Sequence, residues 1–469
     1  MRGFLASSIG VTCAAALAFP LAPPAAAQAP TSGRPSVSAE PHVPGNTQSL
    51  PLRPLVGDRA PGAAVQGLPR RDVRHFSLVG VVWDDPDTEL HGSVQVRTRA
   101  ADTGAWSDWQ DLQTHQAEHA ADPDTPERTS GRVRGATAPL WVGESDGVEV
   151  RVRAHADGAE DQGAGATDRA VPPAAAPLPS GLRLELVDPG EGDPPPAGVP
   201  ADGPRTGALS AEAAAAGAAS AVNADLAPLG AVEIPALSRA QTESELLALG
   251  IDALTGQPGQ SGQQQAKPYV GPRPRIVTRR GWGADESLRE KKFAYTKKVK
   301  AAFVHHSATG NNYRCSQAPS VIRGIYRYHA KSMGWRDIGY NFLIDKCGKI
   351  YEGRAGGVAK PVLGAHTLGF NSNSMGIAVL GTYTSKKPSA AAVRAVSRLT
   401  AWKLGLYGMN PRGKTYLKSA GGNLHRKGKK VRLNVISGHR DGFRTDCPGR
   451  KLYGKLGTAR STAARYQGR

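Results

Sequence analysis

Ala301-Ala302-Phe303-Val304-His305-His306 decides how the C-terminal part of this 469-residue sequence folds. Its apolar residues predict a short buried strand, and two histidines stand where that strand ends. Further apolar runs predict strands at Tyr340–Ile344, Lys349–Tyr351, Met375–Leu380 and Leu433–Ile436. Apolar residues at helical spacing predict helices over Val321–His329 and Ala391–Leu406. Residues 271–469 are therefore predicted to form an α/β domain with a central mixed β-sheet flanked by helices.

A different pattern occupies residues 70–190. Apolar residues alternate with polar ones over Val94–Val96, Val148–Val152 and Leu182–Leu186, with turn residues between the runs. Period-two alternation predicts half-buried antiparallel strands, so this region is expected to be an all-β, sandwich-like domain. Trp106 and Trp109 could stack on sugar rings there, but strand packing is the favoured interpretation. The cluster Asp84, Asp85 and Asp87 is interpreted as a solvated turn rather than a calcium site, because it lacks EF-hand spacing.

The remaining segments are a predicted signal peptide, a lead-in and a linker. Met1-Arg2, the apolar run Phe4–Leu21 and the small residues Ala25–Ala27 predict a signal peptide over residues 1–27. Residues 28–70 are expected to be a flexible lead-in, and the Ala-, Pro-, Gly- and Gln-rich residues 191–270 a disordered linker. A membrane anchor and a lipoprotein linked through Cys13 are the disfavoured alternatives. No later segment reaches the roughly 18 apolar residues that span a bilayer, so a secreted protein of the extracellular space or cell wall is expected, with a monomer as its expected state.

Charge divides the chain in two. The net charge is +19, but residues 271–469 contain 40 Lys and Arg against 8 Asp and Glu, whereas residues 1–270 contain 19 against 32. A basic exported domain attracts polyanions. Anionic wall polymers or an anionic membrane surface are favoured over a specific nucleic acid. The split itself indicates two regions with different partners.

Three residues at predicted strand ends or in loops form a candidate metal site. His305 ends the first strand, His439 follows Leu433–Ile436, and Cys447 comes eight residues later. A catalytic zinc site uses three protein ligands and keeps one position open, and two His with one Cys suit it. Zinc lowers the pKa of a bound water and polarises a substrate carbonyl. Taken by themselves, residues so far apart in sequence are a weak signal.

A series of motifs, in order along the chain, strengthens the evidence for this metal site. They are Arg280–Ala284, Phe303–Thr309, Tyr328-His329, Gly334–Phe342, Ile350–Arg354, Gly364–Thr367, Ser374–Ile377, Ser437–Asp441 and Thr445–Gly449. Over about residues 275–460 the sequence resembles the peptidoglycan recognition proteins and their relatives, the phage-lysozyme-type, zinc-dependent N-acetylmuramoyl-L-alanine amidases. The resemblance does not extend to residues 28–270.

The resemblance implies a role for each matching residue. His305, His439 and Cys447 match the Zn²⁺ ligands, and His306 is expected to point to the other face of its strand. Tyr340 matches an active-site tyrosine that is expected to hydrogen-bond the zinc-bound water or the developing oxyanion, and Thr445 matches a position that helps to stabilise the tetrahedral intermediate. The groove that binds muramyl peptides is implied to include His329, Arg354, His366 and Asn371. The implied reaction is hydrolysis of the amide between N-acetylmuramic acid and L-alanine of peptidoglycan.

The cysteines bear on the alternatives. Relatives that only bind peptidoglycan commonly have Ser at the position of Cys447, so the retained Cys favours an enzyme over a non-catalytic recognition protein. A cysteine amidase with Cys447 as nucleophile and His439 as base is a third, disfavoured interpretation, because it leaves His305 without a role. With Cys447 assigned to zinc, Cys315 and Cys347 remain to form a disulfide, which would contribute about 3–4 kcal/mol in the chain-entropy model.

Overall fold

The computed structural model describes residues 45–55, 65–114, 116–155, 177–191, 217–226, 231–248 and 269–469. The predicted signal peptide lies outside these residues. The described residues fall within one compact unit, His42–Arg469. Among them, no helix is both long enough and apolar enough to cross a membrane.

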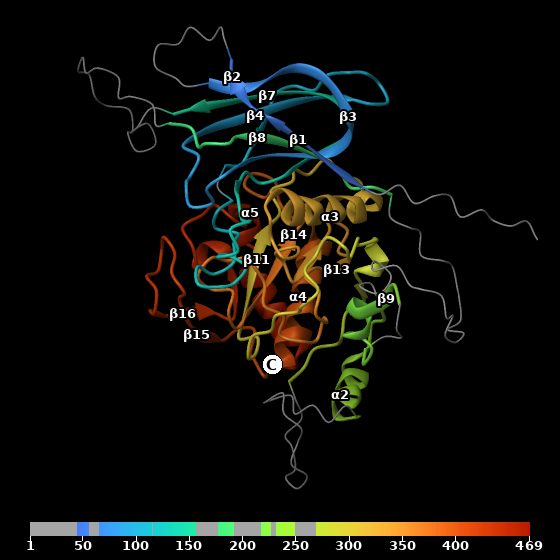
Figure 1. Ribbon diagram of the computed structural model, residues 1–469. Coiled ribbons are helices and arrows are strands. Elements are labelled where there is room, and N and C mark those ends of the chain that lie inside the picture. The colour runs from blue at the N-terminus through green and yellow to red at the C-terminus, as the bar shows by residue number, and fades with distance from the viewer. Residues whose placement is uncertain are drawn as a thin grey trace, which may run out of the picture. The chain divides into compact units, whose positions relative to one another are not determined.

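The N-terminal domain is all β, as the alternating pattern predicts (Figure 1). Its long strand β3 pairs with β7 from Val65 to Val79 and with β8 from Leu78 to Val82, giving the order β1-β8-β3-β7-β4-β5. Inward residues of these strands form one apolar core that includes Phe76, Val96 and Val150. The strands are β1 (Asn46–Pro51), β2 (Arg53–Pro54), β3 (Val65–Trp83), β4 (Gly92–Ala100), β5 (Gln110–Leu112), β6 (Gly135–Ala136), β7 (Leu140–Ala154) and β8 (Arg183–Asp188).

The sheet starts earlier in the chain than the expected lead-in allows. Residues 46–54 form β1 and β2, and β3 begins at Val65, so 28–70 is not wholly a lead-in. β1 is a polar edge strand that pairs only with β8, so its sequence lacks the alternating apolar pattern. On the face of β4 and β7, the Arg97 and Arg151 guanidinium carbons lie 4.8 and 4.1 Å from the Trp109 ring centroid. These cation–π contacts favour packing over sugar stacking for this Trp.

The C-terminal domain is built on a seven-stranded mixed sheet of order β17-β11-β14-β12-β13-β10-β9. Strand β11 lies between β14 and β17 and is parallel to both. The predicted strand Leu433–Ile436 is divided in the structure, because β16 pairs with β15 in a separate hairpin and β17 joins the sheet. The strands are β9 (Glu233–Ile234), β10 (Ile276–Val277), β11 (Ala301–His306), β12 (Phe342–Ile344), β13 (Ile350–Glu352), β14 (Ser374–Val379), β15 (Lys414–Lys418), β16 (Lys430–Asn434) and β17 (Ile436–Gly438).

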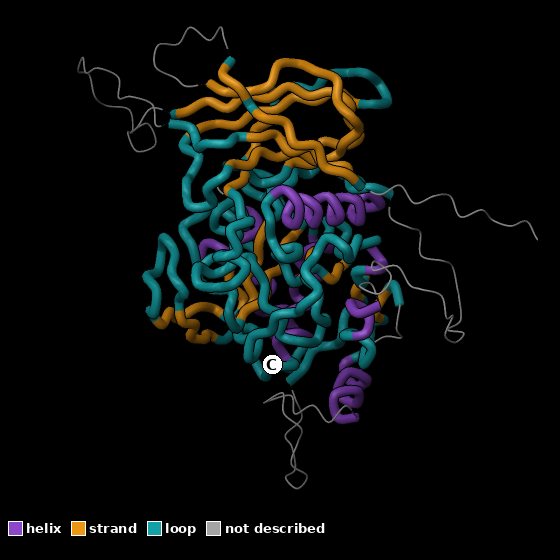
Figure 2. Tube along the Cα trace, viewed as in Figure 1, coloured by secondary structure: helices purple, strands orange, loops and turns teal. Residues whose placement is uncertain are grey.

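Helices cover both faces of this sheet (Figure 2). On one face α4 and α6 share a core with Ala302 and Val304 of β11, and on the other α3 packs against Leu343 of β12 and Ala378 of β14. The helices are α2 (Arg239–Ala248), α3 (Ala318–Arg327), α4 (Ala390–Gly405), α5 (Arg450–Tyr453) and α6 (Leu456–Tyr466), with a π-helical turn at Tyr328–Ser332 and 3₁₀ turns at Arg280–Trp282, Cys315–Gln317 and His439–Asp441.

Part of the expected linker belongs to the C-terminal domain. β9 adds an antiparallel strand to β10 at the edge of the sheet. The Asn223 amide donates to Glu352 Oε1 at 3.0 Å and its oxygen accepts from the Val358 backbone N–H at 2.8 Å. A two-residue strand and an isolated buried amide leave no periodic apolar pattern, so composition by itself indicates a linker over these residues.

The two domains share a core. Leu78, Val82 and Trp141 of the β domain are in one apolar cluster with Ile322 and Ile325 of α3. Polar groups cross the same contact, because the Tyr328 hydroxyl donates to the Thr137 carbonyl at 3.1 Å and the Ser332 hydroxyl to Glu185 Oε2 at 2.8 Å. The β domain is therefore packed against the α/β domain through buried side chains.

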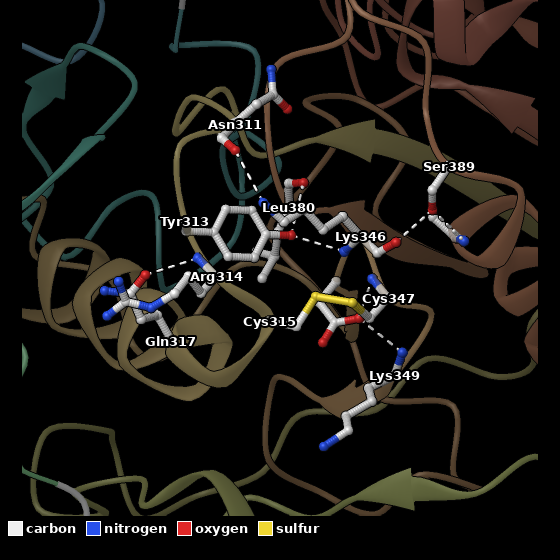
Figure 3. The surroundings of a disulfide bond; sticks show 12 residues. Asn311, Tyr313, Arg314, Cys315, Gln317, Lys346, Cys347, Lys349, Leu380 and Ser389 are labelled. Carbon is white, nitrogen blue, oxygen red and sulfur yellow. Dashed lines mark hydrogen bonds between the residues drawn. A yellow bond between two sulfur atoms is a disulfide. The ribbon is translucent and has the colours of Figure 1, made fainter.

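Cys315 and Cys347 form the expected disulfide (Figure 3). It joins the 3₁₀ turn before α3 to the turn between β12 and β13, with the Cα atoms 6.2 Å apart. The same turn is held by Asp345, whose Oδ1 accepts from the backbone N–H groups of Cys347 and Lys349, both at 2.9 Å.

Replacing Cys315 and Cys347 together by Ala is expected to lower the free energy of unfolding by about 3 kcal/mol, because the unfolded chain regains the freedom of the closed loop. Urea unfolding of the oxidised wild type and the double variant measures this difference. Reductant should lower the stability of the wild type only, and an equal effect on both proteins would contradict the prediction.

Candidate metal centre

The three ligands expected from the sequence come together at one end of the sheet. His305 lies in β11, His439 opens the 3₁₀ turn after β17, and Cys447 lies between that turn and α5. All three are buried, with exposed fractions of 0% for both His and 2% for Cys. Strands β11 and β17 are parallel neighbours, which is why residues 134 positions apart meet.

A fourth residue joins them from the β domain. His119 offers a ring nitrogen to the same cluster, and one ligand atom from each of His119, His305, His439 and Cys447 lies within 4.8 Å of every other. His119 Nε2 is 3.5 Å from Cys447 Sγ, and His305 Nδ1 is 3.7 Å from it. The ring centroids of His119 and His439 are 4.4 Å apart.

The chemistry of this donor set fits a metal ion. Among the residues that the structure describes, neither buried ring nitrogen of His439 has a hydrogen-bond partner. Burial holds the pKa of His305 and of His439 well below the usual value, so both rings are neutral, as ligation requires. Burial raises the pKa of the Cys447 thiol. A cation would offset that cost by stabilising the thiolate, and N₃S donors suit Zn²⁺.

Strand alternation separates the two adjacent histidines. His305 Nε2 lies 3.4 Å from Thr367 Oγ1, which leaves Nδ1 directed at Cys447. Such a contact to the outer nitrogen fixes the orientation of a ligating imidazole. His306 points elsewhere, and its Nδ1 accepts from the Tyr383 backbone N–H at 3.3 Å.

Both expected catalytic residues border the cluster. The Tyr340 ring centroid is 5.5 Å from that of His305, and burial raises the pKa of Tyr340 well above its usual value, so the phenol keeps its proton. The Thr445 hydroxyl accepts from the Cys447 backbone N–H at 3.0 Å and donates to Glu118 Oε1 at 2.7 Å. Burial raises the pKa of Glu118 to about 8.

The four expected groove residues are buried and lie around the same cluster. His329 packs on Trp335 with ring centroids 4.4 Å apart, and the His366 ring centroid is 5.3 Å from that of His305. Burial and the nearby Arg354 charge lower the pKa of both histidines to about 3. Arg354 and Asn371 make their main side-chain contacts with the β domain, to Glu127 and Asp122.

Sequence reasoning missed His119, Glu118 and Gln116. A signal is present in the spacing His115-x-x-Glu118-His119, which is that of a known zinc-binding motif. The motif usually lies on a helix, whereas residues 117 and 118 form a turn and 119 and 120 a bend. Nothing in the spacing itself predicts that the partner ligands come from another domain.

Comparison with known proteins gives matches over both domains. Residues 295–450 match the family model described as N-acetylmuramoyl-L-alanine amidase, and residues 30–176 match the model described as Rv3811 N-terminal galactose-binding domain-like. The wild-type structure of Drosophila PGRP-LB is 25% identical and covers 39% of this chain and 92% of that chain, with a TM-score of 0.31.

Two relatives support the assignment of the chain to a family. Peptidoglycan-recognition protein SC2 of Drosophila simulans is 30% identical over 185 residues, which are 39% of this chain and 85% of that protein. The human N-acetylmuramoyl-L-alanine amidase is 36% identical over 137 residues, which are 29% of this chain and 20% of that protein. The chain therefore belongs to the family of peptidoglycan-recognition proteins and type 2 N-acetylmuramoyl-L-alanine amidases.

Proposed function

We propose that this protein is a secreted, zinc-dependent amidase that hydrolyses the bond between N-acetylmuramic acid and L-alanine in peptidoglycan. One observation carries the proposal: His305, His439 and Cys447 are buried together, and both ring nitrogens of His439 lack a hydrogen-bond partner. Retention of Cys447 completes a ligand set that a purely recognising relative does not need.

In this reaction water adds to the lactyl carbonyl carbon, the C–N bond breaks, and the stem peptide leaves with a free amino group on its N-terminal L-alanine. Bound zinc would polarise the carbonyl and lower the pKa of the attacking water. The Tyr340 hydroxyl, protonated and next to His305, would donate to the oxygen on which charge develops. Thr445 would add a second hydroxyl beside Cys447.

Groove residues would position the muramyl peptide. The Arg354 guanidinium suits a carboxylate of the stem peptide, because its fork binds carboxylates through two hydrogen bonds. Asn371, His329 and His366 would supply neutral donors and acceptors, since burial keeps both histidines uncharged. The basic residues of the same domain would favour binding to anionic wall polymers.

A recognition protein with a structural zinc is the second candidate. His119 favours it, because a zinc with four protein ligands is typical of structural sites. A cysteine nucleophile is disfavoured, because burial raises the pKa of Cys447 and so suppresses the reactive thiolate.

Product analysis tests the proposal. Purified cell walls incubated with the full chain should release new N-terminal L-alanine, detectable by dinitrophenylation. A chelator should stop the release, and added zinc should restore it. Binding to walls without new amino termini, in all variants including those described below, would favour the recognition protein instead.

Tyr340→Phe is expected to lower kcat about 100-fold, in the range for loss of one oxyanion donor. Because the ring remains, KM should change little. Tyr416→Phe is the matched control, since Tyr416 is 58% exposed in the β15–β16 hairpin. Equal rates for wild type and Tyr340→Phe would remove Tyr340 from the mechanism.

A further inference from the structure

We infer that His119 is a fourth ligand of the metal and that residues 116–127, here called the plug loop, keep the amidase latent by occupying its groove. This inference rests on the proposed function, because latency has meaning only for an active enzyme. It goes beyond that function by assigning a metal-binding and regulatory role to the β domain.

The plug loop belongs to an unusually long connection. Residues 113–134 join β5 to β6, two short strands of the β domain, and are coloured teal in Figure 1. Connections longer than about 12–15 residues without secondary structure are uncommon in compact domains and are usually functional. Gln116, Glu118, His119, Asp122 and Glu127 of this loop are all less than 7% exposed. Five polar side chains so deeply buried require partners.

The position of His119 suits metal ligation. Around a tetrahedral zinc with Zn–N of about 2.0 Å and Zn–S of about 2.3 Å, nitrogen and sulfur ligands lie about 3.5 Å apart. The His119 Nε2 to Cys447 Sγ distance is 3.5 Å, and the His305 Nδ1 to Cys447 Sγ distance is 3.7 Å. Both imidazoles are therefore placed as ligands of one ion. With His119 bound, the position that a catalytic zinc keeps for water is taken.

Catalytic side chains are also engaged by the loop. The Glu118 side-chain Oε1 accepts from the Thr445 hydroxyl at 2.7 Å. The Tyr340 ring centroid lies 5.9 Å from that of His119. On the backbone, the Glu118 carbonyl accepts from the Leu368 N–H at 2.9 Å. Of the two groups expected to stabilise the oxyanion, Thr445 is thus already hydrogen-bonded to the loop and Tyr340 packs against it.

The expected substrate groups are occupied in the same way. Glu127 accepts two hydrogen bonds from Arg354, both at 2.8 Å. Asn371 Nδ2 donates to the Ala120 carbonyl and to Asp122 Oδ1, both at 2.8 Å. Glu127 therefore stands where a carboxylate of the stem peptide would bind, and a muramyl peptide must displace the loop to reach Arg354.

Charge holds the loop in place. Residues 116–127 include no Lys or Arg, and Glu127 forms a buried ion pair with Arg354 of the strongly basic domain. Asp124 adds an exposed ion pair with Lys427 at 2.5 Å. Burial tends to raise the pKa of Glu127, but Arg354 outweighs it and the pKa is lowered, so this carboxyl stays ionised. Acidic residues of the N-terminal region thus pair with basic residues of the C-terminal domain.

X-ray absorption at the zinc edge of the full chain tests the ligand. Wild type should show three imidazoles and one thiolate, and His119→Ala two imidazoles. His91→Ala is the matched control, because His91 is an exposed histidine of the same domain and should keep three. Two imidazoles in wild type would overturn the inference.

Binding of a small ligand to the metal tests whether the plug loop blocks the site. In the cobalt-substituted proteins, acetohydroxamic acid should alter the visible spectrum of His119→Ala and leave wild type unchanged. The double variant Asp122→Ala/Glu127→Ala keeps all four ligands and loosens the loop, so it should also respond. If the wild-type site binds acetohydroxamic acid as readily as the variants do, the inference that the plug loop blocks the metal is wrong.

Exposure of new N-terminal L-alanine in cell walls tests latency. Both variants should exceed the wild-type rate at least about tenfold, and equal, measurable rates would overturn latency. If no protein exposes new N-terminal L-alanine while the two spectroscopic results hold, the proposed amidase activity fails and the fourth ligand stands. The two failures are therefore distinguishable.

Discussion

Cys447→Ser is expected to weaken zinc binding by at least about 100-fold, more than the 10–100-fold loss seen when only an outer-shell partner is removed. A serine hydroxyl keeps its proton near neutral pH and cannot replace the thiolate that binds zinc. Because the donors are buried, no solvent-exposed side chain can take over. Hydrolysis of cell walls should be abolished. Zinc content after dialysis and competition with a chromophoric chelator measure the affinity.

The variant is best compared in two backgrounds. In wild type and in His119→Ala, Cys447→Ser should remove both zinc and activity. The control is Cys315→Ser/Cys347→Ser, which removes the other two cysteines of the described chain and should retain zinc. Wall hydrolysis that survives Cys447→Ser would refute the zinc mechanism.

Arg279→Met should destabilise the folded chain by about 3–5 kcal/mol, the usual cost of removing one partner of a buried ion pair. Arg279 is 2% exposed and binds Glu286 Oε1 at 2.6 Å and Asp337 Oδ1 at 3.1 Å. It also donates to the Gly353 carbonyl at 2.5 Å. Methionine fills most of the volume, so the expected loss comes from carboxylates left in an apolar surrounding. The midpoint of urea unfolding reports the change.

Arg275→Met provides the control for this prediction. Arg275 pairs with Glu233 at 3.3 Å, but its side chain is 69% exposed, so the expected cost is below about 1 kcal/mol. The Arg279 variant should also lose wall hydrolysis, because Gly353 precedes Arg354 and Asp337 lies three residues before Tyr340. Equal shifts of the urea unfolding midpoint for both variants would contradict the larger stabilisation expected from the buried ion pairs of Arg279.

Much of the metal centre could be predicted from local pattern. The apolar run 301–304 indicates a strand, and alternation along it places His305 and His306 on opposite faces, as the structure has them. Ordered motifs identified Cys447, and with it the pairing of Cys315 and Cys347. The alternation over Val148–Val152 likewise predicted a strand of the β domain.

Some strands of the fold could not be predicted from a local sequence pattern. β1 is polar because it lies at the edge of its sheet, and β9 is only two residues long. The predicted strand Leu433–Ile436 is divided between a hairpin and the main sheet, which no local property of four residues reveals. In each case the partner strand, not the segment itself, determines the structure.

What the sequence by itself determined was a basic α/β domain with three candidate metal ligands and the family to which it belongs. Only the tertiary structure decided that a fourth residue, His119, reaches the same site. His119 is 186 residues before His305 and lies in a loop whose acidic side chains look like ordinary solvated charges. Their role depends on burial against Arg354, Asn371 and Thr445, and burial is set by the packing of two domains rather than by neighbours in sequence.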